Sequence, residues 1–383
     1  MENYFNTRNK KLCNGCGTCA LKCPKNAITM VEDSEGFLYP EIDEKKCVKC
    51  GICEKVCSNF NNSADNPKAY IAINNDEEEL KISSSGGMFF ILARYVTKNN
   101  GVVFGVTYDK EVKAFHKYVS TLEGCKEFCG SKYVRSDVKN TYKEAKEFLE
   151  NGRIVLYTGT ACQLNGLKTF LGKEYDNLIL CDILCHANPS PKVFELYKKN
   201  IENLNGKKIR EIKFRSKENG WRNQTPIIEF EDGTKIEENS YFNAFVKEMI
   251  NRPSCYQCVF ASKKRIADIT IADFWGIEKF NENLDTSKGV SLITVNSEKG
   301  KNILQSMKES LYLEEVEMDA VIKFNHFHNV LVHKNREKFF EELGKGKITE
   351  NNIINKMNQY TKVSIIRKVL RKLKRIAKKI LKK

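Results

Sequence analysis

CNGCGTCALKCP, residues 13–24, and CVKCGICEKVCS, residues 47–58, decide how the first part of the chain folds. In both stretches four cysteines follow one another with two, two and then three residues between them. Gly15, Gly17 and Gly51 lie inside these runs, and glycine allows the tight turns that bring cysteines three positions apart onto one face of a loop. The backbone N–H groups of such a loop can donate hydrogen bonds to the group that the thiolates hold. The spacing therefore predicts two metal-binding loops.

The duplicated spacing is that of bacterial two-cluster ferredoxins, in which the fourth cysteine of each run ligates the cluster of the other run. The sequence thus predicts two 4Fe-4S clusters. The first set of ligands is Cys13, Cys16, Cys19 and Cys57, and the second set is Cys47, Cys50, Cys53 and Cys23. A structural zinc site is the alternative, but a zinc ribbon uses two CxxC pairs and has no need for eight cysteines in duplicated quartets.

A β-hairpin is expected between the two cysteine runs. AITMVEDSEGFLYPEID, residues 27–43, has alternating apolar positions around a turn at Asp33–Gly36. After the second run, NFNNSADNP, residues 59–67, is polar and turn-rich, which is typical of a linker. We therefore expect a two-cluster ferredoxin domain at residues 1–62.

The body of the chain alternates between strand-like and helix-like stretches, which favours a mixed α/β sheet. Helices are expected at residues 86–98 and 141–150, and antiparallel strands are expected as additions to the sheet around residues 209–231. The remaining strands are expected at residues 69–73, 102–108, 114–120, 154–160, 178–185 and 269–276.

Three loops of small residues are candidate ligand sites. Residues 83–87, SSSGG, precede an apolar helix, where free backbone N–H groups suit a phosphate; the alternative is an ordinary serine cap. Lys132 lies in the small-residue stretch 130–134, for which a plain surface turn is the alternative. Residues 157–163 place a glycine and a cysteine at the end of a strand, and ligands of open α/β sheets bind at that edge.

Seven further cysteines lie outside the ferredoxin runs. Cys255 and Cys258 have the spacing of a metal-ligand pair, but one pair cannot close a tetrahedral site. Cys162 and Cys185 follow strands and could complete a third cluster with that pair. Cys181 lies inside an apolar strand and is interpreted as a buried apolar side chain. Cys125 and Cys129, on a predicted helix, are the remaining thiols and could be free.

Four histidines are further candidate ligands or proton carriers: His186, His326, His328 and His333. Of these, only His186 adjoins a suspected site, because it follows Cys185. His326 and His328 have aromatic neighbours, so a packed helix is the alternative there. The sequence identifies no catalytic residue.

Composition excludes several classes of protein. No stretch of the 383 residues reaches the 18 to 20 apolar residues of a membrane span, and the N-terminus has no apolar segment typical of a secretory signal. We therefore expect a cytoplasmic protein. In such a reducing compartment, fifteen cysteines are more typical of metal ligands or redox groups than of disulfides.

The net charge of +15 comes mostly from the end of the chain. Residues 361–383 contain eleven Lys or Arg and no acidic residue, so the rest of the chain is nearly balanced and a nucleic-acid-binding surface is not expected. Apolar positions recur every three or four residues in this tail, which predicts a basic amphipathic helix that contacts an anionic membrane surface at the inner face of the cell membrane. The alternatives are a helix docked on the body or on an acidic partner.

Five sequence stretches in the body occur together in one protein family. In chain order they are SSSGGMFFILARYVTKNNGVVFGVTYD, GSKYVRSD, TGTACQLNGLKTFL, CDILCHANPSPKVFELY and CYQCVFASKKRIADITIADFWG. With them, residues 66–330 resemble the coenzyme F-420 hydrogenase/dehydrogenase beta-subunit family. The resemblance implies a flavin-binding domain at residues 66–330. We expect a helical extension at residues 331–360 and the basic helix at residues 361–383 after it.

The resemblance also implies a cofactor and its site. It implies FAD, with a flavin site made by Ser84, Ser85, Gly86, Gly87, Lys132, Thr158, Gly159 and Thr160. It implies a third cluster held by Cys162, Cys185, Cys255 and Cys258, with Asp273 and Trp275 close to that region.

A flavin also has a physical rationale in this chain. It accepts single electrons from clusters and delivers them in pairs, so it joins the two kinds of chemistry. We expect an iron–sulfur flavoprotein oxidoreductase that relays electrons between a donor or acceptor (a redox protein or a small molecule) and an unidentified organic substrate or hydride carrier. Relatives suggest a link to polysaccharide biosynthesis. The alternative is a non-catalytic electron-transfer or scaffold subunit of a membrane-associated complex.

Overall fold

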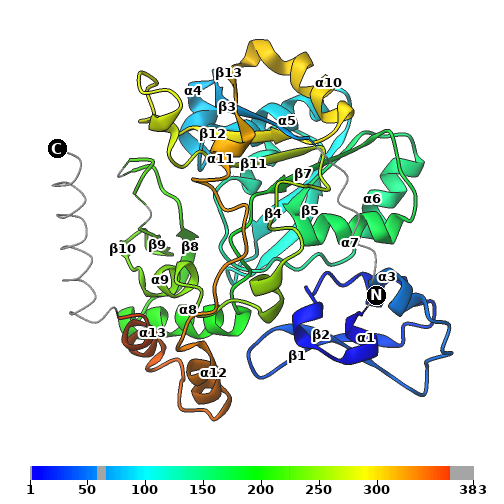
Figure 1. Cartoon of the computed structure of the whole chain (residues 1–383). Helices are drawn as coiled ribbons and strands as arrows, with labels where there is room; N and C mark the ends of the chain where they lie inside the picture. The colour runs from blue at the N-terminus through cyan, green and yellow to red at the C-terminus, as the bar shows by residue number, and fades with distance from the viewer. Residues whose placement is uncertain (1, 58–65, 219, 224, 363–383) are drawn as a thin grey trace.

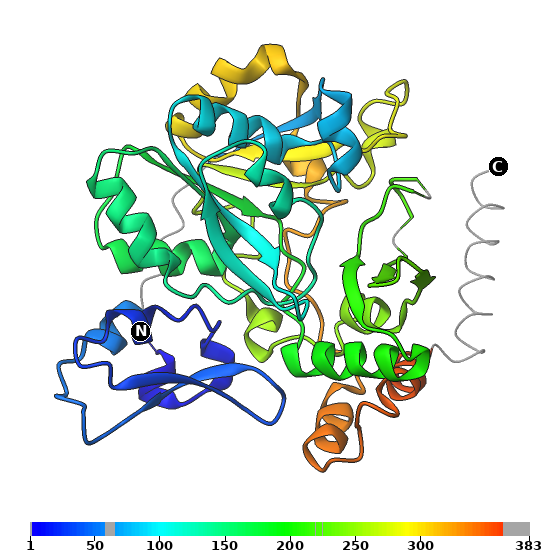
Figure 2. The same cartoon turned by 180° about the vertical axis from the view of Figure 1, so that it is seen from behind.

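The computed structural model describes residues 2–57, 66–218, 220–223 and 225–362 (Figures 1 and 2). The predicted linker at residues 59–67 lies almost entirely outside the described residues, and so does the predicted basic helix, of which only its first two residues are described. Within the described residues, every helix is too short or too polar to span a lipid bilayer.

The N-terminal module contains the predicted hairpin, with several short helices beside it (Figure 1). The hairpin strands pair antiparallel from Ile28 with Ile42 to Glu32 with Leu38. The Asp33 carboxylate closes the turn because it accepts hydrogen bonds from the backbone N–H groups of Glu35 and Phe37. The elements are α1 (Tyr4–Thr7), η1 (Lys10–Leu12), α2 (Thr18–Lys22), β1 (Ile28–Glu32), β2 (Leu38–Ile42) and α3 (Ile52–Cys57).

The body is built on one mixed eight-stranded sheet in the order β13-β3-β12-β11-β7-β6-β4-β5. Strands β4, β6, β7 and β11 are parallel to one another, and β5, β12 and β13 each pair antiparallel with a neighbour. This confirms the mixed α/β fold that the sequence predicts. The strands are β3 (Lys68–Asn74), β4 (Val102–Tyr108), β5 (Ala114–Val119), β6 (Val155–Thr160), β7 (Leu178–Ile183), β11 (Ile269–Asp273), β12 (Ser291–Val295) and β13 (Leu311–Val316).

Helices cover both faces of this sheet. On one face Phe90 and Leu92 of α5 pack with Leu304 of α10 in one buried cluster, and on the other face Tyr142 of α6 packs with Leu164 of α7 in a second one. The helix α7 follows β6 directly because Thr160 and Gln163 form a reciprocal capping box at its start. These helices are α4 (Glu77–Ile82), α5 (Met88–Lys98), α6 (Thr141–Glu150), α7 (Ala161–Leu171) and α10 (Glu298–Met307).

A second, smaller sheet lies beside the body, in the order β10-β9-β8. The sequence predicts antiparallel strands here as additions to the main sheet, and that placement is wrong, because the strands form a sheet of their own. They pack with the neighbouring helices and with Phe37 and Tyr39 of the N-terminal hairpin in one buried cluster. The elements are α8 (Pro191–Asn205), β8 (Ile209–Lys213), β9 (Ile227–Phe230), β10 (Lys235–Glu237), α9 (Ser240–Val246), α12 (Arg336–Gly344) and α13 (Ile353–Thr361).

Short elements complete the described chain: η2 (Gly124–Phe128), η3 (Pro253–Gln257), η4 (Ile277–Lys279), η5 (Lys308–Ser310) and α11 (Met318–Val321). From α11 an irregular segment runs down the molecule to α12, between the large sheet and the small sheet (Figure 1). The packed helix considered for His326 and His328 is therefore wrong, because both lie in this irregular segment.

Candidate metal centres

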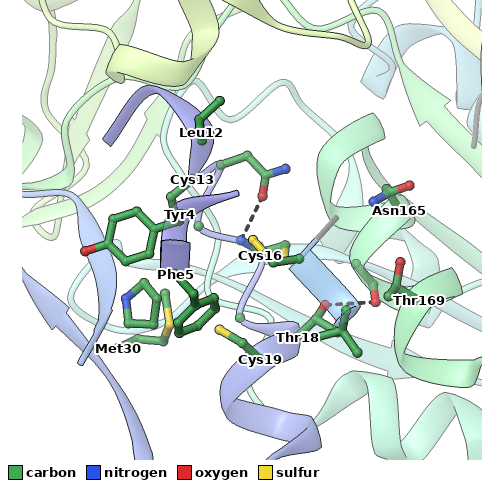
Figure 3. Close-up of a pocket in the computed structure, with 17 residues that line it drawn as sticks. Tyr4, Phe5, Leu12, Cys13, Cys16, Thr18, Cys19, Met30, Asn165 and Thr169 are labelled. Carbon is green, nitrogen blue, oxygen red and sulfur yellow. Dashed lines mark hydrogen bonds between the residues drawn. The ribbon is translucent and has the colours of Figure 1, made fainter. Parts of the chain in front are cut away.

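The first predicted set of cysteines lines one pocket (Figure 3). Cys13 follows η1, Cys16 lies in the glycine loop, Cys19 lies in α2 and Cys57 ends α3. Gly15 and Gly17 both have positive φ, at 71° and 79°, so the loop needs residues without a Cβ to turn this tightly.

The four thiols share an electrostatic environment. Burial, together with the neighbouring thiols of Cys16 and Cys13, raises the pKa of Cys57 to about 11. Burial also raises the pKa of Cys19, and Cys16, Cys13 and Cys57 add to that effect. Cys57 from the second run therefore lies with three cysteines of the first run, which is the crossed arrangement that the spacing predicts.

The walls of this pocket fit an iron–sulfur cluster. Tyr4, Phe5, Leu12 and Met30 provide an apolar lining, and Asn165 and Thr169 of α7 lie across from them (Figure 3). Four converging thiols in an apolar pocket are the donor set that a 4Fe-4S cluster uses. In the described part of the chain, no three His, Cys, Asp or Glu side chains lie close enough together to hold a single metal ion.

The second predicted set lies further out. Cys50 is exposed and Cys23, Cys47 and Cys53 are partly buried. The Cys23 sulfur accepts a hydrogen bond from the backbone N–H of Ala27 at 3.2 Å. Burial raises the pKa of Cys53, and the nearby Cys47 thiol contributes in the same direction. Their role as ligands of the second cluster stays a prediction.

A third group of cysteines converges in the body, drawn from separate segments. Cys162 opens α7, Cys185 follows β7, Cys255 lies in η3 and Cys258 follows it. Burial raises the pKa of Cys185, and the thiols of Cys255, Cys162 and Cys258 raise it further. Burial likewise raises the pKa of Cys255 to about 12, with contributions from Cys162 and Cys258. The tertiary structure thus gathers all four predicted ligands of the third cluster.

Polar contacts hold this third group in place. The backbone N–H of Asn188 donates to the Cys255 sulfur at 3.3 Å, and Arg135 Nη1 donates to the Cys162 sulfur at 3.4 Å. Nearby, Arg265 forms a fully buried ion pair with Asp182 of β7. Arg265 also donates to the carbonyl of Phe260, which ties the loop after Cys258 to the sheet.

The third group and the first set face one another across a close contact. The Thr18 hydroxyl donates to the carbonyl of Gly166 at 2.9 Å (Figure 3). Tyr142 donates to the carbonyl of Cys16 at 3.4 Å. A Cβ on Gly166 would lie 2.9 Å from the Cβ of Cys16, so only glycine lets α7 approach the cysteine loop this closely. Two arginines, Arg135 and Arg252, also cross this contact.

The serine loop expected at the flavin site adopts a specific conformation. Its Ser84 hydroxyl accepts from the backbone N–H of Ser131 at 2.9 Å, and Ser85 donates to the carbonyl of Val290. The alternative of a serine cap is wrong, because α5 begins after Gly87, which has a φ of 79° and makes no side-chain cap. The loop therefore lies over the ends of β3 and β12, against the stretch that contains Lys132.

The other flavin candidates lie at the carboxyl edge of the same sheet. Lys132 Nζ donates to the carbonyls of Phe128, Cys129 and Gly130, and burial lowers its pKa to about 8. Thr158 donates to the carbonyl of Phe104, and Gly159 lies against His116. Thr160 caps α7. Their role in binding a flavin stays a prediction.

Comparison with known proteins identifies two parts of the chain. Residues 152–321 match the family model for the C terminus of the coenzyme F420 hydrogenase/dehydrogenase beta subunit, and residues 12–60 match the 4Fe-4S dicluster domain. Residues 152–321 belong to that beta-subunit family. The predicted resemblance to this family is thereby confirmed. The N-terminal module is a 4Fe-4S dicluster domain that carries iron–sulfur clusters.

Two individual proteins are similar to the chain. The DNA-directed RNA polymerase subunit Rpo3 of Methanosarcina acetivorans is 44% identical over 45 residues, which cover 12% of this chain and only 16% of that curated relative. The structure of the xenon-derivatised F420-reducing NiFe hydrogenase complex from Methanosarcina barkeri contains a similar chain. It has a TM-score of 0.47 and 16% identity, and the match covers 79% of this chain and 94% of that one.

The beta-subunit domain contains a polar and aromatic cluster that sequence reasoning recognised only in part. Trp221 and Trp275 stack with their planes 1° apart and their ring centres 5.6 Å apart. Asp273 accepts from the indole of Trp221 at 3.0 Å and pairs with Arg215. The motif ADFWG pointed to Asp273 and Trp275. Trp221 and Arg215 come from the turn after β8, and no local pattern marks them.

The remaining candidate residues are cysteines and histidines in the body of the chain. Cys181 is fully buried in β7, as expected, and burial raises the pKa of Cys129 to about 12. His186 lies edge-on to His326, with ring centres 4.9 Å apart, and burial lowers the pKa of His186 to about 4. His333 is not part of this pair; its ring accepts from the backbone N–H of Asn335.

Proposed function

We propose that this protein is an iron–sulfur flavoprotein oxidoreductase. The observation that carries the proposal is the convergence of Cys162, Cys185, Cys255 and Cys258 next to the pocket of the first cysteine set. Isolated buried thiols are structurally inert, but four of them together provide the ligands of a further cluster. A chain with three such cysteine groups suits electron transfer into the body.

The exposure of the cysteines supports an order for this transfer. Cys50 of the second set is exposed, whereas Cys13 and Cys19 of the first set are only 8% and 9% exposed. The second set would therefore exchange electrons with an external donor or acceptor. The first set, which contacts α7 and the loop before Cys255, would pass them to the third group.

FAD is the proposed cofactor beyond the third group. Ser84, Ser85, Gly86 and Gly87 form a small-residue loop over the sheet, and Thr158, Gly159 and Thr160 end β6 at the same edge. Small residues and a half-buried lysine, Lys132, fit a ligand that carries phosphates. A bound flavin would supply the conversion between single electrons and electron pairs. An organic substrate or hydride carrier, which we propose belongs to polysaccharide biosynthesis, would react there.

Anaerobic purification followed by iron, sulfide and flavin analysis tests the proposal. Three clusters correspond to about twelve irons and twelve sulfides per chain, and FAD should appear at about one per chain. The variant C258S should lose about four irons while the two N-terminal clusters keep their EPR signals. Zinc in place of iron would contradict the proposal at its first step.

A second result separates enzyme from carrier. An enzyme should show a flavin absorbance band that bleaches with dithionite. Protein with a full set of clusters and no flavin would instead favour a non-catalytic electron-transfer or scaffold subunit.

A further inference from the structure

Arg252 links the loop of the third cysteine group to the first cysteine set. Its guanidinium donates from Nε to the carbonyl of Cys13 at 2.8 Å, and Nη2 lies 3.5 Å from the Cys13 sulfur. The side chain is only 3% exposed and stacks over Tyr39 at 4.3 Å. Its own backbone carbonyl accepts from the N–H of Cys255 at 3.0 Å. Arg252 therefore touches both cysteine groups, the first set with its guanidinium and the loop of the third group with its backbone carbonyl.

Arg135 makes a second link of the same kind. Its Nη1 donates to the Cys162 sulfur at 3.4 Å, and its Nη2 donates to the carbonyl of Gly15 at 2.8 Å. Both arginines meet at Gly15, since a Cβ built there would lie 3.1 Å from Nη1 of Arg252. Each arginine thus joins the backbone of the first cysteine loop to the body, and each has a cysteine sulfur as its other partner or neighbour.

We infer that Arg135 and Arg252 are positioning residues that couple the first cysteine set to the third group and raise the reduction potentials of the centres held there. The inference rests on the proposed function, because it requires a cluster at each site. Clusters held at the two sites would exchange one electron, so that one would be oxidised and the other reduced by one electron with no bond or proton changed.

The physical reason is the charge of a cluster and its thiolates, which becomes more negative on reduction. A buried guanidinium stabilises the added electron because the surroundings screen the attraction poorly. Charge-assisted hydrogen bonds to sulfur act in the same direction, since hydrogen bonds to sulfur and net charge tune cluster potentials. Arg252 touches Cys13, so it should act mainly on the first centre, and Arg135 touches Cys162, so it should act mainly on the third.

A purely structural role for the two arginines predicts something different. If they only fasten the N-terminal module to the body, removing either one would lower the thermal stability and leave the potentials of intact clusters unchanged. The reduction potential therefore distinguishes the two roles, and it is measured without any substrate.

The experiment is an anaerobic, EPR-monitored redox titration of the full chain and of R252Q, R252K, R135Q and R135K. R252Q should shift the midpoint of the first centre to lower potential by the equivalent of at least a tenfold change in the reduction equilibrium, which is about 59 mV for one electron. R135Q should do the same to the third centre. The lysine variants keep the charge and should recover most of each shift.

Arg153 provides the matched control, because its guanidinium also donates to backbone carbonyls, those of Asn100 and Gly101, but at the opposite edge of the sheet. R153Q should leave all midpoints unchanged. If the unmodified protein has three centres and R135Q and R252Q leave their midpoints unshifted, this inference is overturned and the proposed function is not. An unmodified protein with only about eight irons would overturn the third centre and with it both proposals. If a glutamine variant fails to fold, the methionine variant at the same position replaces it, and equal midpoints in the methionine and lysine variants would overturn the inference.

Discussion

Arg336 in α12 and Glu35 in the N-terminal hairpin form a two-pronged ion pair, although they are 301 positions apart in the chain. Nη1 and Nη2 of Arg336 lie 3.1 Å and 2.5 Å from the two carboxylate oxygens of Glu35. The same guanidinium donates from Nε to the carbonyl of Asn251 at 3.0 Å, just before the loop of Cys255. One side chain therefore fastens the ferredoxin module, the third cysteine group and the C-terminal helices to one another.

Glu35→Gln should loosen this junction. It leaves the mostly buried Arg336 without its counter-charge, so we expect a loss of about 1–3 kcal/mol in unfolding free energy. Anaerobic denaturant titration measures this. Glu341→Gln breaks an exposed pair with Lys345, the residue that follows α12, and serves as the control, with an expected change below about 0.5 kcal/mol. Equal effects of the two variants would contradict the role given to Glu35.

Gly166→Ala should disturb the contact between α7 and the first cysteine loop. The added methyl group would lie 2.8 Å from the Tyr142 hydroxyl and 2.9 Å from both Cys16 and Thr18. We expect a loss of about 1–3 kcal/mol from overpacking, together with faster loss of iron on exposure to air. Gly344→Ala is the control, because a Cβ at that position meets only Ser34, at 3.8 Å. A chelator assay measures the rate of iron release. A rate that Gly166→Ala leaves unchanged would argue against a tight contact.

His116 should make the fold acid-sensitive. The imidazole is 1% exposed and burial lowers its pKa from about 6.5 to about 4, so the folded state resists a proton that the unfolded state binds. The contribution of His116 to the unfolding free energy is therefore fully present above about pH 6.5. It is lost as the pH falls from about 6.5 to about 4, and the loss is at most about 3 kcal/mol. His116→Gln should flatten this part of the profile of unfolding free energy against pH. An unchanged slope would show that other groups cause it.

Tryptophan fluorescence should report on the flavin site. The chain contains only two tryptophans, and Trp221 and Trp275 stack on each other beside the loop of Ser85. Adding FAD to protein freed of flavin should quench most of the emission, and Trp275→Phe should weaken flavin retention by about tenfold if the ring contacts the cofactor. Tyr312→Phe, at an exposed position on β13, is the control. Emission that does not respond to FAD would place the flavin elsewhere.

Local patterns in the sequence predicted the hairpin between the cysteine runs, the helices α5 and α6 and six of the eight strands of the main sheet, but not β12 and β13. Each of these elements depends on periodicity within one stretch, and the ferredoxin module depends on the cysteine spacing of its two runs. One prediction and two alternatives were wrong. The antiparallel strands β8 and β9 form a separate sheet, no serine caps α5, and His326 and His328 lie in an irregular segment and not in a helix. The separate sheet packs with distant parts of the chain, which a local pattern does not encode.

The sequence by itself determined which residues are chemically capable of holding clusters, because thiol spacing and strand periodicity are properties of short segments. Only the tertiary structure decided that Cys162, Cys185, Cys255 and Cys258 meet, that this group lies against the first cysteine loop, and that Arg135 and Arg252 bridge the two. Such contacts join residues up to about 240 positions apart, as between Cys13 and Arg252. They arise from burial of the sheet faces and the hairpin in shared cores, which no spacing along the chain encodes.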